Sequence, residues 1–98
     1  MMDLRECRER IHRIDARIAE LYTERMEVAE AVAQYKIARG MQILDAAREE
    51  QKLEQAEKMV PERERTGIRE VFALLMKLSR RRQQEIVRAA GKDCGEET

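Results

Sequence analysis

Residues 4–35, LRECRERIHRIDARIAELYTERMEVAEAVAQY, contain a stripe of mostly apolar side chains at intervals that alternate between three and four. This heptad spacing predicts one long helix that buries a narrow seam against partner helices. Arg25 is the exception in the stripe, because a guanidinium group removed from water needs an anionic partner. The seam consists of Leu4, Cys7, Ile11, Ile14, Ile18, Leu21, Arg25, Val28, Val32 and Tyr35.

The predicted first helix is too long for a small single-chain domain. Asp3 is a suitable N-cap, and neither Pro nor Gly occurs between it and Gly40, so we expect the helix to end near Arg39. At about 1.5 Å per residue it is roughly 50 Å long, whereas a compact domain of this size is about 30 Å across. Since the seam continues along the overhang, we expect a second copy of the chain to cover it in a two-fold dimer.

Two shorter helices are predicted after a short loop. Asp45 is the expected N-cap of a second helix that runs to about Met59, and Pro61 ends that segment. A third helix is expected to begin between residues 62 and 66 and to reach Ala90, where a glycine follows.

The fold class expected from these three helices is all-α. The composition agrees, because 41% charged and 3% aromatic residues are typical of proteins built from long helices. We expect a single all-helical domain over residues 1–91 and a disordered C-terminal tail over residues 92–98.

Charge, hydropathy and cysteine content argue against several classes of protein. A net charge of zero argues against binding to nucleic acid or to an anionic membrane. The consecutive Arg80, Arg81 and Arg82 spread over about 200° of a helix, so they form no single basic stripe. No apolar run approaches the about 20 residues of a transmembrane helix, and the N-terminus lacks the apolar core of a signal peptide, so we expect a cytoplasmic protein. Cys7 and Cys94 are expected to be reduced, and no metal-ligand spacing occurs.

Polar side chains interrupt the apolar stripes of all three predicted helices. Lys36 lies 11 residues after Arg25, on the same helix face and about 16 Å further along. Glu49 interrupts the second stripe, and Ser79 and Gln83 interrupt the third stripe one turn apart. Structural interpretations stay open: Glu49 could pair with Arg25 or Lys36, and Ser79 could bond the carbonyl group one turn earlier.

Arg8 cannot serve the same face of the first helix. It lies 17 residues before Arg25, which is about 100° short of five turns. Taken alone it is a solvated surface side chain, but in a two-fold dimer it could reach the partner's pocket.

Together the interrupting residues indicate a binding site. Interior cations, a carboxylate, a hydroxyl and an amide suit a small organic ligand that carries more than one negative charge. No Cys–His pair, Ser–His pair or phosphate-binding loop is present in the sequence. Any catalysis is therefore expected to come from positioning and electrostatic stabilisation.

From about Leu4 to Ala89 the sequence resembles the all-helical class of chorismate mutase. Residues 13–25, RIDARIAELYTER, are similar to that family's first helix, and residues 45–49, DAARE, match its Asp-x-x-Arg-Glu segment. The remaining matches are Arg8, Arg25 and Lys36 on the first helix, and Ser79 and Gln83 on the third.

The resemblance implies that chorismate rearranges to prephenate by a Claisen shift, a step of the shikimate pathway towards phenylalanine and tyrosine, without a cofactor, a metal or a covalent intermediate. Lys36 and Gln83 would donate to the ether oxygen, which gains negative charge as its C–O bond breaks. Glu49, with Asp45 at the start of the second helix, would hold the ring hydroxyl.

The resemblance also implies an intertwined homodimer with two equivalent sites. Arg25 and the partner subunit's Arg8 would clamp the two carboxylates of the substrate. Arg48 and Ser79 would assist them.

The sequence departs from the family pattern at Arg80, where related enzymes often carry an apolar residue that lines the pocket. An inward Arg80 would alter substrate binding, whereas an outward one would not. Leu44 stands where some relatives have a basic residue. Two other functions stay open: an isochorismate pyruvate-lyase, which has a similar fold and cationic site, and a catalytically silent dimerisation or regulatory domain.

Overall fold

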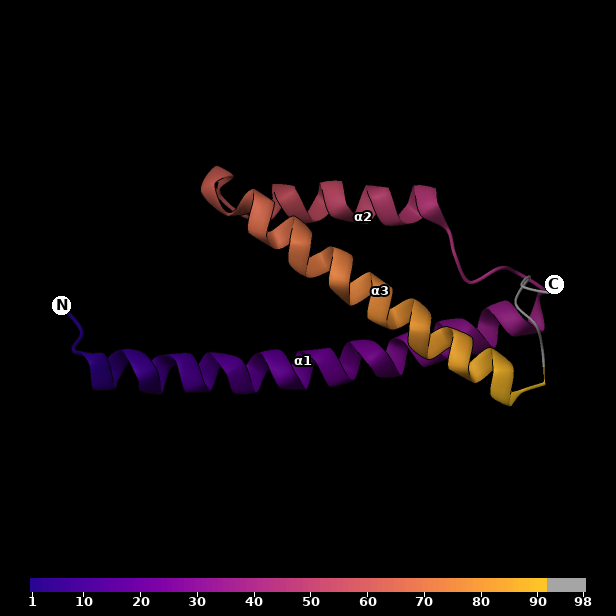
Figure 1. Cartoon of the computed structure of the whole chain (residues 1–98), viewed down its shortest axis with the longest axis horizontal. Helices are drawn as coiled ribbons and strands as arrows, with labels where there is room; N and C mark the ends of the chain where they lie inside the picture. The colour runs from indigo at the N-terminus through magenta and orange to yellow at the C-terminus, as the bar shows by residue number, and fades with distance from the viewer. Residues whose placement is uncertain (92–98) are drawn as a thin grey trace.

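The computed structural model describes residues 1–91, and within that range it contains helices and no strand. The all-α prediction with three helices is therefore confirmed. Figure 1 shows α3 running obliquely from the far end of α2 to the C-terminal half of α1. The elements are α1 (Leu4–Ala38), α2 (Ala46–Lys58), the short 3-10 helix η1 (Glu62–Glu64) and α3 (Arg65–Ala89).

The helix ends follow from local capping, as predicted. The Asp3 carboxylate accepts from the Glu6 amide at 2.8 Å, and the Glu6 carboxylate accepts from the Asp3 amide at 3.1 Å, a reciprocal capping box. Asp45 caps α2 by accepting from a first-turn amide at 3.0 Å. Gly40 (φ 66°) and Gly91 (φ 75°) follow α1 and α3 in the left-handed conformation that terminates helices.

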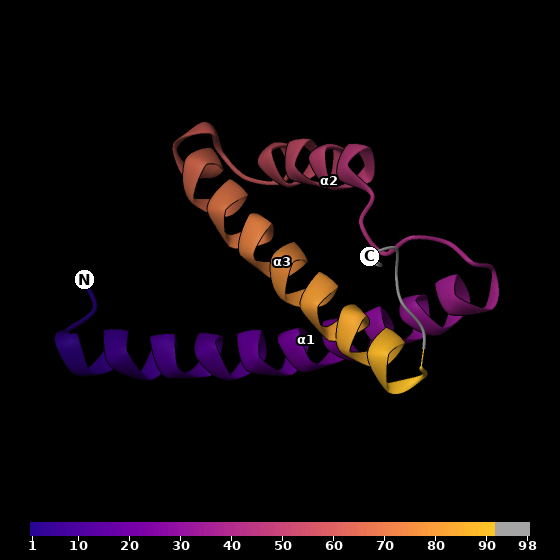
Figure 2. The same cartoon turned by 45° about the vertical axis from the view of Figure 1, so that its right-hand side comes forward.

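The buried core lies where α3 crosses α1 and α2, both of which it contacts (Figure 2). α1 contributes Met26, Ala29 and Ala33, and the two alanines let the helix axes approach closely. This face is not the predicted seam, because Val28 and Val32 are 57% and 38% exposed. The expectation that the seam forms the packing face of α1 is therefore wrong for contacts within one chain. The other buried apolar residues are Ile43, Ala56, Met76 and Val87.

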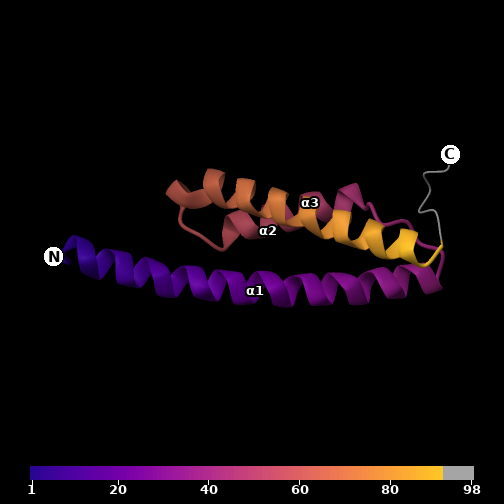
Figure 3. The ribbon, with the colours of Figure 1, turned by 60° about the horizontal axis from the view of Figure 1, so that its bottom comes forward.

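The seam remains exposed along α1. The chain is 57 Å long, and the N-terminal part of α1 extends beyond α2 and α3 (Figure 3). Monomeric proteins rarely expose an apolar strip of this length. The seam residues on the overhang, Leu4, Ile11, Ile14, Ile18 and Leu21, are each more than half exposed.

Ion pairs on the surface join α3 to both of its neighbours. Arg69 pairs with Glu50 at 2.7 Å and with Glu57 at 3.5 Å, which ties α3 to α2. The hydrogen bond that Arg69 donates to Glu50 raises the pKa of Arg69 above its ordinary value, so this side chain stays cationic. Arg82 pairs with Glu30 of α1 at 2.6 Å.

Two further expectations concern the C-terminal tail and the membrane. The predicted disordered tail, residues 92–98, and Cys94 within it lie outside the described residues. Over residues 1–91, no helix combines the length and the apolar character needed to cross a membrane.

Candidate functional site

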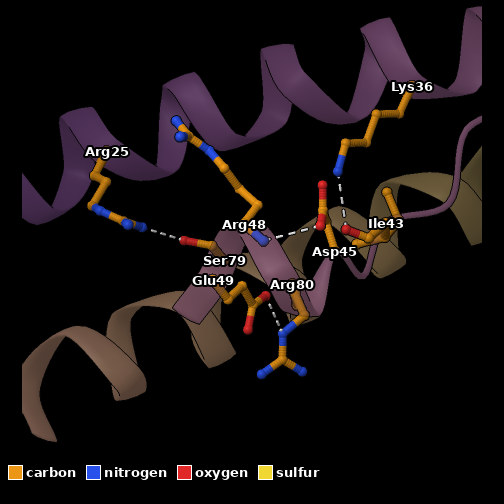
Figure 4. A network of polar contacts seen from close by, with 8 residues as sticks. All are labelled: Arg25, Lys36, Ile43, Asp45, Arg48, Glu49, Ser79 and Arg80. Atoms are coloured by element: carbon orange, nitrogen blue, oxygen red, sulfur yellow. Dashed lines mark hydrogen bonds and ion pairs between the residues drawn. The ribbon is translucent and has the colours of Figure 1, made fainter. Parts of the chain in front are cut away.

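A cavity of about 350 Å³ lies between the three helices, and seven of the eight predicted site residues line it. Of these seven residues, those of α1, of α2 and of the α2 N-cap supply cationic groups and carboxylates, whereas those of α3 supply a hydroxyl and an amide. Figure 4 shows these side chains, apart from that of Gln83, converging from the three helices. The seven residues are Arg25, Lys36, Asp45, Arg48, Glu49, Ser79 and Gln83.

Arg25 occupies one end of the cavity and contacts α3. Its Nη1 donates to the Ser79 hydroxyl at 2.6 Å, and no carboxylate of the described chain forms an ion pair with it. A guanidinium group has five N–H donors, so most of them stay available to a ligand. Ser79 is 9% exposed and accepts this bond; within residues 1–91 it makes no bond to the carbonyl one turn earlier.

Lys36 lies at the other end of the cavity, near the end of α1 (Figure 4). Its ammonium group donates to the carbonyl oxygen of Ile43 at 3.0 Å. This bond fixes the loop before α2 against α1. An ammonium group has three donors, so two remain for a ligand.

The first turn of α2 presents Asp45, Arg48 and Glu49 to the cavity. Asp45 is committed as the N-cap, because its Oδ1 accepts from the Arg48 amide at 3.0 Å. The Arg48 side chain extends towards α1, and in Figure 4 it lies between Arg25 and Lys36. Three cationic groups thus face the same space.

Glu49 forms an ion pair that the sequence did not reveal. Its Oε2 accepts from Nε of Arg80 at 2.8 Å. The structural interpretation in which Glu49 pairs with Arg25 or Lys36 is therefore wrong. Arg80, whose direction the sequence left open, lines the cavity, and its guanidinium group pairs with Glu49 and is directed away from Arg25 and Lys36 (Figure 4).

Gln83 is the most buried polar side chain among the described residues, at 7% exposure. Its Nε2 donates to the carbonyl oxygen of Ala29 at 3.0 Å, which joins α3 to α1. Since an amide nitrogen carries two hydrogens, the second remains for a ligand in the cavity.

Arg8 does not reach this cavity in the single chain. It lies on the overhang of α1, beside a shallow groove formed with Leu4, Arg5 and neighbouring residues. The helical rise separates it from Arg25 by about 26 Å along α1.

Lys52 lines the cavity and was missed by the sequence reasoning. It follows Arg48 by four residues on α2, so helical spacing was the signal that could have found it. The lining includes five cationic side chains and two carboxylates, which makes the cavity electropositive and suits a small anionic ligand. The cations are Arg25, Lys36, Arg48, Lys52 and Arg80, and the carboxylates are Asp45 and Glu49.

The lining contains no cysteine or histidine, so it offers no Cys–His or Ser–His pair. The arrangement can hold an anion and direct N–H donors at a developing negative charge. No curated protein and no solved structure matches the chain significantly. The model of one protein family, chorismate mutase type II, matches residues 7–84, a range that includes all eight candidate residues. The chain therefore belongs to the chorismate mutase type II family.

Proposed function

We propose that this chain is an active chorismate mutase that rearranges chorismate to prephenate in the synthesis of phenylalanine and tyrosine. The observation that carries the proposal is the convergence on one electropositive cavity of seven of the site residues that the family resemblance implies. A domain used only for dimerisation has no need of buried Ser79 and Gln83 beside unpaired cations.

The cation arrangement suits a substrate with two carboxylates. Arg25 keeps free N–H donors after its bond to Ser79, and Arg48 extends into the same space. We assign these groups to one carboxylate end of chorismate, with Ser79 holding Arg25 in place. Bidentate guanidinium–carboxylate pairs would fix the folded conformation of the substrate that the rearrangement requires.

The donors of Lys36 and Gln83 suit the bond that breaks. Lys36 and Gln83 each hold one backbone carbonyl and keep at least one further N–H. We assign these remaining donors to the ether oxygen. Because they are fixed before the reaction, they stabilise the developing negative charge without reorganisation.

A homodimer would complete the site. The exposed seam of α1 needs a partner surface, and Arg8 lies on the same overhang. We propose that a second copy covers the seam and brings the partner's Arg8 to the cavity. It would bind the second carboxylate of the substrate.

The experiment is turnover of chorismate by the purified chain, with identification of the product. We expect loss of chorismate absorbance and formation of prephenate, and the same rate from Arg81→Ala, which changes an exposed residue outside the cavity. Isochorismate is tested in parallel. Pyruvate release from isochorismate without prephenate formation would assign the lyase reaction, and no turnover of either compound would favour a silent domain.

A further inference from the structure

Arg80 lines the cavity, and its side chain makes one hydrogen-bonded contact, with Glu49. It lies one residue after Ser79 and three before Gln83, so helical spacing puts it at the edge of the same face. Its side chain is 32% exposed and that of its partner Glu49 is 24% exposed. Nε holds one carboxylate oxygen of Glu49 at 2.8 Å and leaves the other oxygen as an acceptor.

The ion pair between Glu49 and Arg80 lies apart from Arg25 and Lys36 in the cavity (Figure 4). Figure 4 shows Glu49 and Arg80 on the α3 side of the site, with the guanidinium group of Arg80 directed away from Arg25 and Lys36. A Glu49 carboxylate without this partner would be attracted to the cations that face the cavity. Arg48, its neighbour on α2, is one of them. Such a pairing would occupy the donors that a ligand carboxylate needs.

We propose that Arg80 is a positioning residue for the rearrangement. It holds Glu49 on the α3 side, so that the free oxygen of Glu49 accepts from the ring hydroxyl of the substrate. The same contact keeps Glu49 from neutralising the cations that bind the substrate carboxylates. This inference rests on the proposed mutase function, and it assigns Arg80 a role that acts through Glu49.

The test is a double-mutant cycle on the purified protein, with kcat and KM for chorismate measured separately. Arg80→Leu keeps the bulk of the side chain and removes the ion pair. We expect KM to rise about tenfold with little change in kcat, because the loss of a charged hydrogen bond weakens binding of the ground state and the transition state alike. Arg80→Lys keeps a cation and should recover part of the lost affinity.

The second arm of the cycle uses Glu49→Gln. An amide cannot neutralise the cations, so adding Arg80→Leu to this background should change KM by less than about twofold. Arg82→Leu is the matched control: it removes an ion pair of α3 with Glu30 outside the cavity and should leave both constants near wild type. Thermal unfolding of each variant identifies any loss of activity that comes from reduced stability of the fold.

The outcomes separate this inference from the proposed function. Additive effects of Arg80→Leu and Glu49→Gln, or an unchanged KM in Arg80→Leu, would overturn the positioning role while the mutase activity of the wild type stands. A wild-type chain without mutase activity would overturn the proposed function and this inference with it.

Discussion

Replacing Gln83 by glutamate tests our assignment of this side chain to the breaking ether bond. Gln83 is buried and uses one amide hydrogen on the Ala29 carbonyl at 3.0 Å, which leaves one for the substrate. A neutral amide does not titrate, so it can donate at any ordinary pH. A carboxylate is nearly isosteric, but it has no hydrogen for either acceptor.

Near neutral pH, we expect Gln83→Glu to lose as much catalytic rate as an enzyme loses when one oxyanion donor is removed. Such a loss costs about 2.7–4 kcal/mol, or about 10²–10³ in rate. The introduced carboxylate would also face the Ala29 carbonyl oxygen, which costs about 1–3 kcal/mol of stability. The unperturbed pKa of a glutamate is about 4.3, and burial raises it, whereas Lys36 and Arg25 oppose that rise.

We therefore predict that Gln83→Glu regains activity as the pH falls and the introduced group becomes protonated. The recovery should be incomplete, because a carboxylic acid has one hydrogen for two acceptors. The assay is kcat/KM from about pH 4.5 to about pH 8, with circular dichroism to verify folding. Gln84→Glu is the matched control, since it makes the same change one residue along α3 and outside the cavity. A Gln83→Glu deficit that is the same at every pH would refute the assignment of Gln83 to the ether oxygen.

Two other predictions concern assembly and stability. Sedimentation of the wild type at micromolar concentration should give a dimer, and a folded, cooperative wild-type monomer would contradict the dimer. Ile18→Asp in the exposed seam should shift the protein to monomer or unfolded chain, whereas Arg17→Ala beside it should not. Asp45→Ala should destabilise the protein by about 1 kcal/mol because α2 loses its N-cap, whereas Asp45→Asn should retain stability because asparagine also caps helices. Equal melting temperatures for the two variants would argue against this role of Asp45.

The helix boundaries were predictable because the signals that set them are local. Asp3, Gly40 and Asp45 act on the chain within four residues of themselves, so a single sequence contains the whole interaction. The polar residues that interrupt apolar stripes were also informative. A buried polar side chain needs a partner, and the buried Ser79 and Gln83 have theirs on α1.

The packing face of α1 was not predictable in the same way. Large apolar residues dominate the heptad pattern, but α3 packs against Met26, Ala29 and Ala33. Alanines carry little weight in a hydrophobic stripe, although they permit the closest approach of two helices. The sequence therefore identified the seam left exposed in one chain and did not identify the face that is covered.

Lys52, which was missed, and Arg80, whose direction was left open, have a different explanation. Lys52 and Arg80 lie on charged helices where a residue at the edge of a cavity looks the same in sequence as one on a solvated face. Only the crossing of α2 and α3 determines that Arg80 meets Glu49. That crossing depends on packing between distant segments, which a helical pattern does not encode.

The central claim is that each site combines the cavity of one chain with Arg8 of the partner subunit. Mixing the inactive homodimers of Arg8→Ala and Arg25→Ala under conditions of subunit exchange tests it most directly. In a mixed dimer both lesions fall in one site and the other site is intact, so random exchange predicts recovery of about a quarter of wild-type activity. Mixed dimers that form, as shown by differential tagging, but recover no activity would contradict the claim.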